Sequence, residues 1–171
     1  QYLHASQPVA GVVLATAGTV EIRRGAETLA AARKTELQVD DEIRTGDNAR
    51  AQLRFADGTI TTLGANTGFR IRQFDWDAGK QKPAAAQFEL VSGAFRTVTG
   101  KVLEARGSQF DVKTPAGTIG IRGTDFWGGY LQGDAVDVLL IDGEHAVEVS
   151  NASGKVLLAK AGQGTTLKAD Q

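Results

Sequence analysis

The sequence contains no cysteine and no methionine, and only three prolines and two histidines occur among its 171 residues. Without cysteine the fold has neither disulfide bonds nor thiol chemistry. The two histidines, His4 and His145, stand far apart and do not form the paired ligand motif of a zinc or iron site. We therefore expect no metal ion and no cofactor, and no residue is predicted to bind either.

The sequence also lacks an excess of one charge and a long hydrophobic run. Lysine and arginine total 19 against 20 for aspartate and glutamate, which gives a net charge of −1. This balance is not the strongly basic one that is typical of nucleic-acid-binding domains. The longest apolar run, 136–141, is interrupted by Asp137 and is far shorter than the roughly 20 residues of a membrane-spanning helix. We expect no nucleic-acid partner and no membrane span.

The sequence begins at Gln1 instead of methionine. Removal of a signal peptide would leave such a start, and this would place the protein in the periplasm or outside the cell. A boundary within a longer, membrane-anchored protein fits equally well. The sequence leaves both interpretations open.

Glycine, by contrast, is abundant, and apolar side chains recur at every second position. Twenty-one glycines separate short runs such as Val20 and Ile22, which alternate with Glu21 and Arg23. Such alternation is typical of strands with one buried face. The clearest hairpin has one strand over 51–55, a turn at Asp57-Gly58 and a return strand that starts at Thr59.

Similar runs continue along the chain and predict an all-β fold. Two windows of helix-forming residues, 27–34 and 101–106, are too short and uncapped to be stable helices, so we expect turns or strand edges there. A weak repeat of strand pairs favours either a twisted sandwich of short antiparallel strands or a β-helix-like solenoid. Further strands are expected at 69–72, 88–90, 95–98, 110–112, 118–121, 136–141, 146–149 and 155–159.

The alternation stops between Asp75 and Gln87, in a stretch that contains Gly79 and Pro83. We interpret 75–87 as a loop between two halves of the chain. The sequence thus predicts a single domain over 1–171 that divides into lobes 9–74 and 88–168.

An ordered set of motifs resembles the FecR domain. At Asp40 the family pattern usually has glycine, and aspartate tolerates the positive φ that such a turn needs. The amino-terminal anti-sigma segment and the membrane helix of well-known members are not present in this sequence. The motifs are LQVDDEIRTG at 37–46, AQLRFADGT at 51–59, LGANT at 63–67, GAFR at 93–96, TPAGT at 114–118 and IRGTDF at 121–126.

The resemblance implies structural roles for residues of two of these motifs, Asp57, Gly58 and Thr59 in one and Arg122, Gly123, Thr124 and Asp125 in the other. In the second motif, Arg122 and Asp125 are expected to form an ion pair that fixes the chain, with contact to a partner as the alternative. The acidic run Asp40-Asp41-Glu42 is expected to be a solvated turn.

Three aromatic residues are the candidate contacts for a partner. Trp76 lies in the expected loop, and Trp127 and Tyr130 lie among glycines. Amphipathic rings in such segments suit either protein recognition or stacking on sugars. The structural alternative is that they cover the ends of the core. Outward-facing arginines, Arg50 with Arg54 and Arg70 with Arg72, predict a cationic sheet face or simply the wet side of a sheet.

The sequence shows no catalytic constellation, since no Gly-x-Ser-x-Gly elbow presents a serine and no carboxylate pair can be identified from spacing. The resemblance implies a bacterial periplasmic module that engages other proteins. We therefore predict a non-enzymatic interaction or signal-sensing module of the envelope, which contacts its partner through a strand edge or an aromatic loop. The alternative function is a carbohydrate-binding or cell-wall-associated module.

Overall fold

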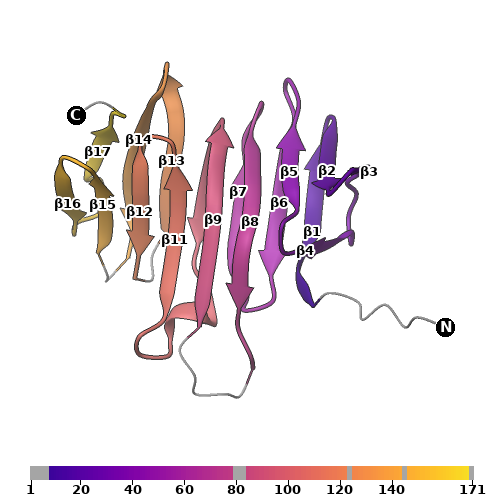
Figure 1. Ribbon diagram of the computed structural model, residues 1–171, viewed down its shortest axis with the longest axis horizontal. Coiled ribbons are helices and arrows are strands. Elements are labelled where there is room, and N and C mark those ends of the chain that lie inside the picture. Colours follow the sequence, from indigo (N-terminus) through magenta and orange to yellow (C-terminus); the bar gives the residue numbers. More distant parts are fainter. Residues whose placement is uncertain (1–7, 79–83, 123–124, 144–145, 170–171) are drawn as a thin grey trace.

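The computed structural model describes residues 8–78, 84–122, 125–143 and 146–169, and within them the chain forms two β-sheets packed face to face (Figure 1). The sheets do not close into a barrel. The predicted all-β sandwich is therefore confirmed.

Sheet A has eight strands and sheet B has nine. In spatial order, sheet A consists of β17 (Gly164–Leu167), β14 (Ala135–Asp142), β13 (Asp125–Gln132), β10 (Ala94–Val98), β7 (Ile60–Leu63), β6 (Arg50–Phe55), β1 (Val9–Ala17) and β4 (Glu36–Gln38). Sheet B consists of β16 (Gly154–Leu158), β15 (Val147–Asn151), β12 (Gly117–Ile121), β11 (Gln109–Thr114), β9 (Ala85–Ser92), β8 (Gly68–Asp75), β5 (Glu42–Thr45), β2 (Val20–Arg24) and β3 (Glu27–Ala30).

The chain builds both sheets together as it advances along the molecule. Strands β6 and β7 belong to sheet A, β8 and β9 to sheet B, and the same exchange of sheets continues to β17. Figure 1 shows the outcome, with β1–β5 at one end of the sandwich and β14–β17 at the other. Neighbouring strands are antiparallel except for β9 and β11, which run parallel.

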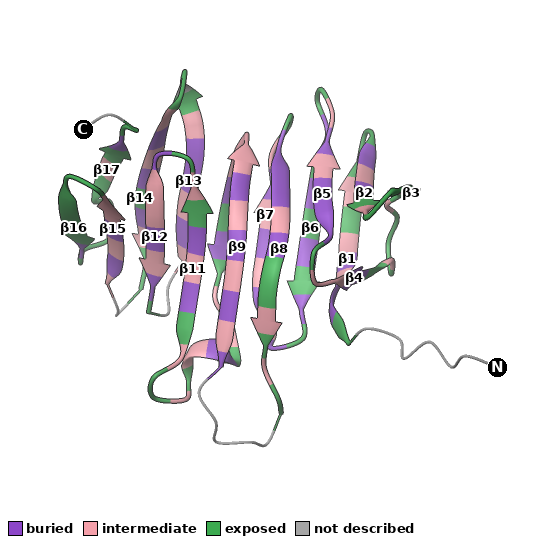
Figure 2. Ribbon diagram, in the orientation of Figure 1, coloured by how far each residue is buried: buried purple, intermediate pink, exposed green. Residues whose placement is uncertain are grey.

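The core lies between the sheets because alternate residues of each strand point inward. On β6, Ala51, Leu53 and Phe55 are buried while the residues between them are exposed, and the same bands appear on other central strands in Figure 2. All seven phenylalanines of the chain belong to one connected set of ring contacts, with centroid separations of 5.0 to 5.8 Å. The members of the set are Phe55, Phe69, Phe74, Phe88, Phe95, Phe110 and Phe126.

The predicted hairpin is confirmed, with Ala51 opposite Leu63 and Arg54 opposite Ile60. Gly58 has a φ of 92° in its turn, in the left-handed region that glycine adopts without a steric cost. The turn at Asp40 likewise has a φ of 75°, as the resemblance requires.

Two sequence expectations need correction. The expected loop 75–87 is shorter, since β8 includes Asp75 and β9 begins at Ala85; residues 79–83 lie outside the described residues. The glycine-containing segment around Trp127 and Tyr130 was not predicted to be a strand, but it forms β13 within sheet A. The window 101–106 contains no long helix, only a single 3₁₀ turn, η1 (Lys101–Leu103).

Candidate protein-interaction surface

The three aromatic residues predicted to contact a partner lie apart. Trp76 directly follows β8 and packs against the core. Tyr130 pairs with Gly93 through the backbone, at the other end of β9, and also packs against the core. Its hydroxyl donates a hydrogen bond to the carbonyl oxygen of Leu90 at 3.2 Å. Both side chains therefore cover ends of the core and do not combine into one binding platform.

Tyr130 is partly buried, and this burial affects the pKa of its phenol. Burial, followed by the negative charges of Asp134 and Glu89, raises the pKa of Tyr130 above its ordinary value. The phenol therefore stays neutral at physiological pH, where it donates its hydrogen bond to Leu90. This is the behaviour of a structural tyrosine.

Trp127 differs from the other two because its side chain lies on the outer face of sheet A. It stands opposite exposed Arg96 on β10 and exposed Leu139 on β14. The indole Cζ2 and Cη2 atoms lie 2.7 and 2.9 Å from the point where a Cβ on Gly129 would be. Only glycine at position 129 leaves room for the ring to lie on the strand.

The neighbouring glycine, Gly128, serves the opposite face of the same strand. A Cβ added to it would lie 2.8 Å from the ring of Phe95, which is buried in the core. The pair Gly128-Gly129 thus makes room for one aromatic ring on each side of β13. These glycines, which did not predict a strand, have a packing role.

Around Trp127 the outer face of sheet A combines apolar and charged groups. Val98 is 45% exposed and Leu139 is 38% exposed. Arg96 donates two hydrogen bonds to Asp125, of 2.9 and 2.6 Å, from its Nε and its terminal nitrogen. We call Val98, Trp127 and Leu139, with the Arg96–Asp125 pair, the Trp127 surface.

The predicted partner of Asp125 was Arg122. In the structure Arg96 holds the Asp125 carboxylate through a cross-strand pair, and Arg122 is exposed after β12. Gly123 and Thr124, between them, lie outside the described residues, as do His4 and His145.

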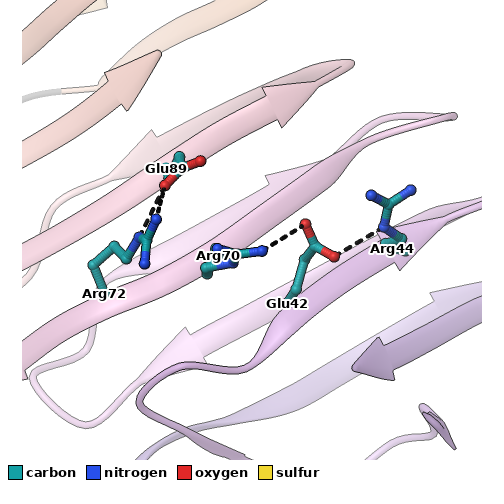
Figure 3. Close-up of polar contacts among 5 residues, drawn as sticks. All are labelled: Glu42, Arg44, Arg70, Arg72 and Glu89. Carbon is teal, nitrogen blue, oxygen red and sulfur yellow. Dashed lines mark hydrogen bonds and ion pairs between the residues drawn. The ribbon is translucent and has the colours of Figure 1, made fainter. Parts of the chain in front are cut away.

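The outer face of sheet B carries a row of alternating charges (Figure 3). Glu42 on β5 accepts a hydrogen bond from Nε of Arg44 at 3.0 Å and pairs with Arg70 of β8 at 3.6 Å. Arg72 donates two hydrogen bonds, of 2.8 and 2.6 Å, to Glu89 of β9. The expected cationic face therefore divides, because Arg70 and Arg72 are neutralised by carboxylates on sheet B while Arg50 and Arg54 are exposed on sheet A.

The prediction of a solvated acidic turn at Asp40-Asp41-Glu42 holds only for Asp40. Asp41 is fully buried and accepts hydrogen bonds from the Arg24 guanidinium and from the backbone N–H of Gln38. Glu42 is only 5% exposed because the arginines cover it. Both carboxylates hold neighbouring strands together.

The motif Asp57-Gly58-Thr59 fastens η1 to the hairpin. The buried Asp57 carboxylate accepts hydrogen bonds from the N–H and hydroxyl of Thr59, at 2.9 and 2.8 Å, and from the N–H of Val102 at 2.8 Å. The Thr59 hydroxyl in turn accepts from the N–H of Gly100 at 2.8 Å. A Cβ at position 100 would lie 2.5 Å from the Asp57 carbonyl oxygen, so Gly100 is needed for this close approach. The motif therefore has the structural role of connecting η1 to the turn between β6 and β7.

The buried carboxylates of Asp41, Glu42 and Asp57 are thus engaged in structural contacts. Within the described residues, no group of three or more histidine, aspartate or glutamate side chains is arranged to hold a metal ion. The same part of the chain contains no helix that is long and apolar enough to cross a membrane. No buried side-chain nitrogen or oxygen of the described residues lacks a hydrogen-bond partner.

Comparison with known families decides the classification. The family described as FecR protein matches residues 41–148, which is more than half of the chain. The chain belongs to the FecR family. This confirms the resemblance inferred from the motifs, and membership gives the chain a signalling or regulatory character.

Solved structures support the fold of this FecR chain. Two crystal structures of a proposed anti-sigma factor from Parabacteroides distasonis ATCC 8503, at 2.50 and 1.65 Å resolution, are 19% identical to it, with TM-scores of 0.55 and 0.54. Each match covers 75% of this chain and 60% of the other chain, so the FecR chain spans little more than half of that protein's length. No curated protein matches the sequence.

The range matched to FecR extends from the start of β5 into β15 and includes the strands that form the Trp127 surface. Strands β1–β4 at one end of the sandwich and strands β16 and β17 at the other lie outside it.

Proposed function

We propose that this FecR chain is a non-enzymatic signalling module of the bacterial envelope that binds a protein partner through the Trp127 surface. The observation that carries the proposal is the position of Trp127, a half-buried indole on the outer face of a central strand, between exposed Leu139 and the Arg96–Asp125 pair. Tryptophan and arginine are the residue types most enriched in the energetic centres of protein interfaces.

The rigidity of the site supports this proposal. Sheet A pairs β13 with β10 on one side and β14 on the other, so Trp127 sits on a strand that is hydrogen-bonded along both edges. The indole also rests on Gly129 and beside Ala94. A partner that binds such a preorganised surface loses little side-chain entropy.

The composition of the surface favours a protein over a glycan. Sugar-binding platforms use several rings side by side, whereas Trp76 and Tyr130 pack against the core away from Trp127. The exposed neighbours of Trp127 combine aliphatic side chains, Leu139 and Val98, with Arg96, which is paired with Asp125. An apolar centre with a polar rim is the usual anatomy of a protein interface.

Family membership supports the envelope location, since FecR domains typically lie in the envelope. Cell fractionation tests this part of the proposal. We expect the protein in the periplasmic or secreted fraction of the source bacterium, and its recovery only with cytosolic markers would contradict the location.

Site-specific photo-crosslinking tests the binding surface. With p-benzoylphenylalanine in place of Leu139, illumination of envelope extract should yield a discrete adduct with one other protein. The substitution Trp127→Thr in the same chain should reduce the adduct by about tenfold, the effect of losing a central aromatic contact. Threonine retains the strand preference of the position, so the fold is preserved.

The matched control places the same photo-reactive residue at Lys113, an exposed position on the outer face of sheet B. This variant should give no adduct of that mass. Equal adduct formation from both positions, or an adduct insensitive to Trp127→Thr, would contradict the proposed surface.

A further inference from the structure

The two edges of sheet B differ in composition, and the edge formed by β16 exposes apolar side chains. Strand β16 pairs with β15 alone, with Val147 opposite Leu158 and Val149 opposite Val156. Because Val147 and Val149 are buried, Leu158 and Val156 face the space between the sheets. Leu158 is buried, but Val156 is 46% exposed. An inward-facing apolar side chain is therefore left uncovered.

The outer side of β16 carries one apolar and one charged side chain. Leu157, opposite Glu148, is 61% exposed, and Lys155 is the only charged residue of the strand. Figure 2 shows β16 as exposed along most of its length. An exposed edge strand that has apolar side chains and unpaired backbone groups is a template for another strand.

The opposite edge of sheet B, formed by β3, carries less apolar surface. Three of its four residues, Glu27, Thr28 and Ala30, are exposed and none of these has a large apolar side chain, while Leu29 is partly buried. The chain crosses between the sheets at both ends, with backbone hydrogen bonds such as Lys34 to Val13 at one end and Gly162 to Leu140 at the other. The crossing after β16 leaves Val156 and Leu157 exposed. The two edges therefore differ in the apolar surface that they expose.

We propose that β16 is covered by β16 of a second copy of the chain, in an antiparallel pair about a two-fold axis at Val156. The axis makes Val156 of each copy the direct partner of Val156 in the other. Such isologous two-fold contacts are the commonest way in which soluble proteins form dimers. This inference concerns a surface other than the Trp127 surface and goes beyond the proposed function.

The register follows from the strand itself. Directly paired residues of an antiparallel pair share a face, so Val156 has to meet an inward-facing residue. Pairing about Val156 uses all five residues of β16, with Gly154 opposite Leu158 and Lys155 opposite Leu157 of the second copy. A slip by one residue would place Val156 on the face of Leu157 and is excluded by the alternation.

Charge also suits a second copy. In this register each Lys155 lies across from Leu157 of the second copy, so the two lysines do not oppose each other. Each ammonium group also keeps its own carboxylate, since Lys155 Nζ lies 3.6 Å from Glu148. A head-to-tail contact with β3 is less suitable, because β3 exposes no large apolar side chain that could meet Val156. The self-complementary pair is thus free of like-charge opposition.

A consequence of this geometry is that the dimer presents both partner-binding faces together. A two-fold axis that joins two antiparallel edge strands is perpendicular to the sheet, and it keeps the outer faces of sheet A on one side. Two Trp127 surfaces would then be available to a bivalent or clustered partner.

Single-cysteine variants test the register, since the natural chain contains no cysteine. Val156→Cys places the two thiols as direct partners, with Cα atoms about 5 Å apart, within the range of a disulfide. Mild oxidation with oxidised glutathione should convert most of this variant into a covalent dimer on non-reducing gels. Lys155→Cys is the matched control: its two Cα atoms would be roughly 8 Å apart, beyond the reach of about 7 Å. We expect it to form about tenfold less dimer.

Light scattering coupled to size exclusion measures the assembly without a crosslink. The unmodified chain should be a dimer at high micromolar concentration, and Val156→Lys should be a monomer because it opposes two ammonium groups at the axis. Ala30→Lys, at an exposed position of the opposite edge strand β3, should remain a dimer. A monomeric unmodified chain, or equal crosslinking of Val156→Cys and Lys155→Cys, would overturn the proposal. Neither result would affect the proposed role of Trp127.

Discussion

Asp111 on β11 illustrates how the sandwich tolerates a carboxylate at a half-buried position. Its side chain lies against Gly120 of β12, and Oδ1 is 3.3 Å from where a Cβ of that glycine would be. Burial, the largest effect, raises the pKa of Asp111, Glu148 raises it further, and Lys113 opposes the shift. The ionised form is thus less favourable in the folded state than in the unfolded chain.

We expect Asp111→Asn to stabilise the protein at neutral pH. A carboxyl group whose pKa is raised on folding contributes most to stability when it is protonated, below its unfolded pKa of about 3.9, and loses that contribution as the pH rises through the folded pKa. Asparagine removes this loss. The gain at pH 7 should be on the order of 0.5 kcal/mol, because solvent screens a half-exposed group.

Urea unfolding at pH 7 and pH 4 measures this effect. The stability difference between Asp111→Asn and the unmodified protein should shrink toward pH 4. Asp47→Asn, in the exposed turn after β5, is the control and should change stability little at either pH. A lower stability of Asp111→Asn at pH 7 would show that Asp111 is held by favourable contacts instead.

At the scale of residues, the sequence predicted which side chains of a strand are buried, but it did not predict which charged side chains form ion pairs. The buried positions of β6 followed directly from period two. Asp41 and Glu42 did not, because their burial depends on Arg24 and Arg70, which are brought to them by strands β2 and β8. A sequence motif alone does not determine which strands become neighbours. The sequence therefore does not distinguish a carboxylate that is buried by an arginine of another strand from one that is exposed to solvent.

At the scale of elements, the fastening of η1 depends on one buried carboxylate. We expect Asp57→Ala to lower the free energy of unfolding by about 3 kcal/mol, because it leaves the N–H groups of Thr59 and Val102 without their acceptor. The loss of stability should concentrate in η1 and in the turn between β6 and β7. Hydrogen exchange followed by mass spectrometry should therefore show faster exchange over 100–104.

The control for this prediction is Glu104→Ala, an exposed residue directly after η1. It should leave both the unfolding midpoint and exchange over 100–104 nearly unchanged. If Asp57→Ala also behaves in this way, the hydrogen bonds of Asp57 do not hold η1 in solution.

The failure to predict strand β13 has a physical cause. Strand β13 contains Gly128 and Gly129, which are poor strand formers in isolation. Their suitability appears only when Phe95 and Trp127 occupy the two sides of the strand. Tertiary packing thus overrides local preference, and the aromatic residues flanking the glycines were the available signal. The site prediction was similarly partial, since it named Trp127 but could not separate it from Trp76 and Tyr130.

At the scale of the whole molecule, both sheets continue across the stretch where the sequence suggested a boundary between lobes. Strand β8 pairs with β9 and strand β7 pairs with β10, so each sheet joins the two halves by backbone hydrogen bonds. Contacts such as Phe55–Phe88 and Phe69–Phe95 cross the same boundary in the core. We propose on these grounds that 9–74 and 88–168 unfold as one domain.

The two tryptophans provide a direct test, because Trp76 directly follows β8, the last strand of the first half, and Trp127 lies in the second half. In Trp127→Phe the fluorescence comes from Trp76 alone, and in Trp76→Phe it comes from Trp127 alone. For each variant, urea unfolding followed by tryptophan fluorescence should coincide with unfolding of the same sample followed by far-ultraviolet circular dichroism, as a two-state transition requires. Comparison within one variant cancels the effect of the substitution on stability. A fluorescence transition that is separated from the dichroism transition in either variant would show that the two lobes unfold independently, despite the strands and rings that join them.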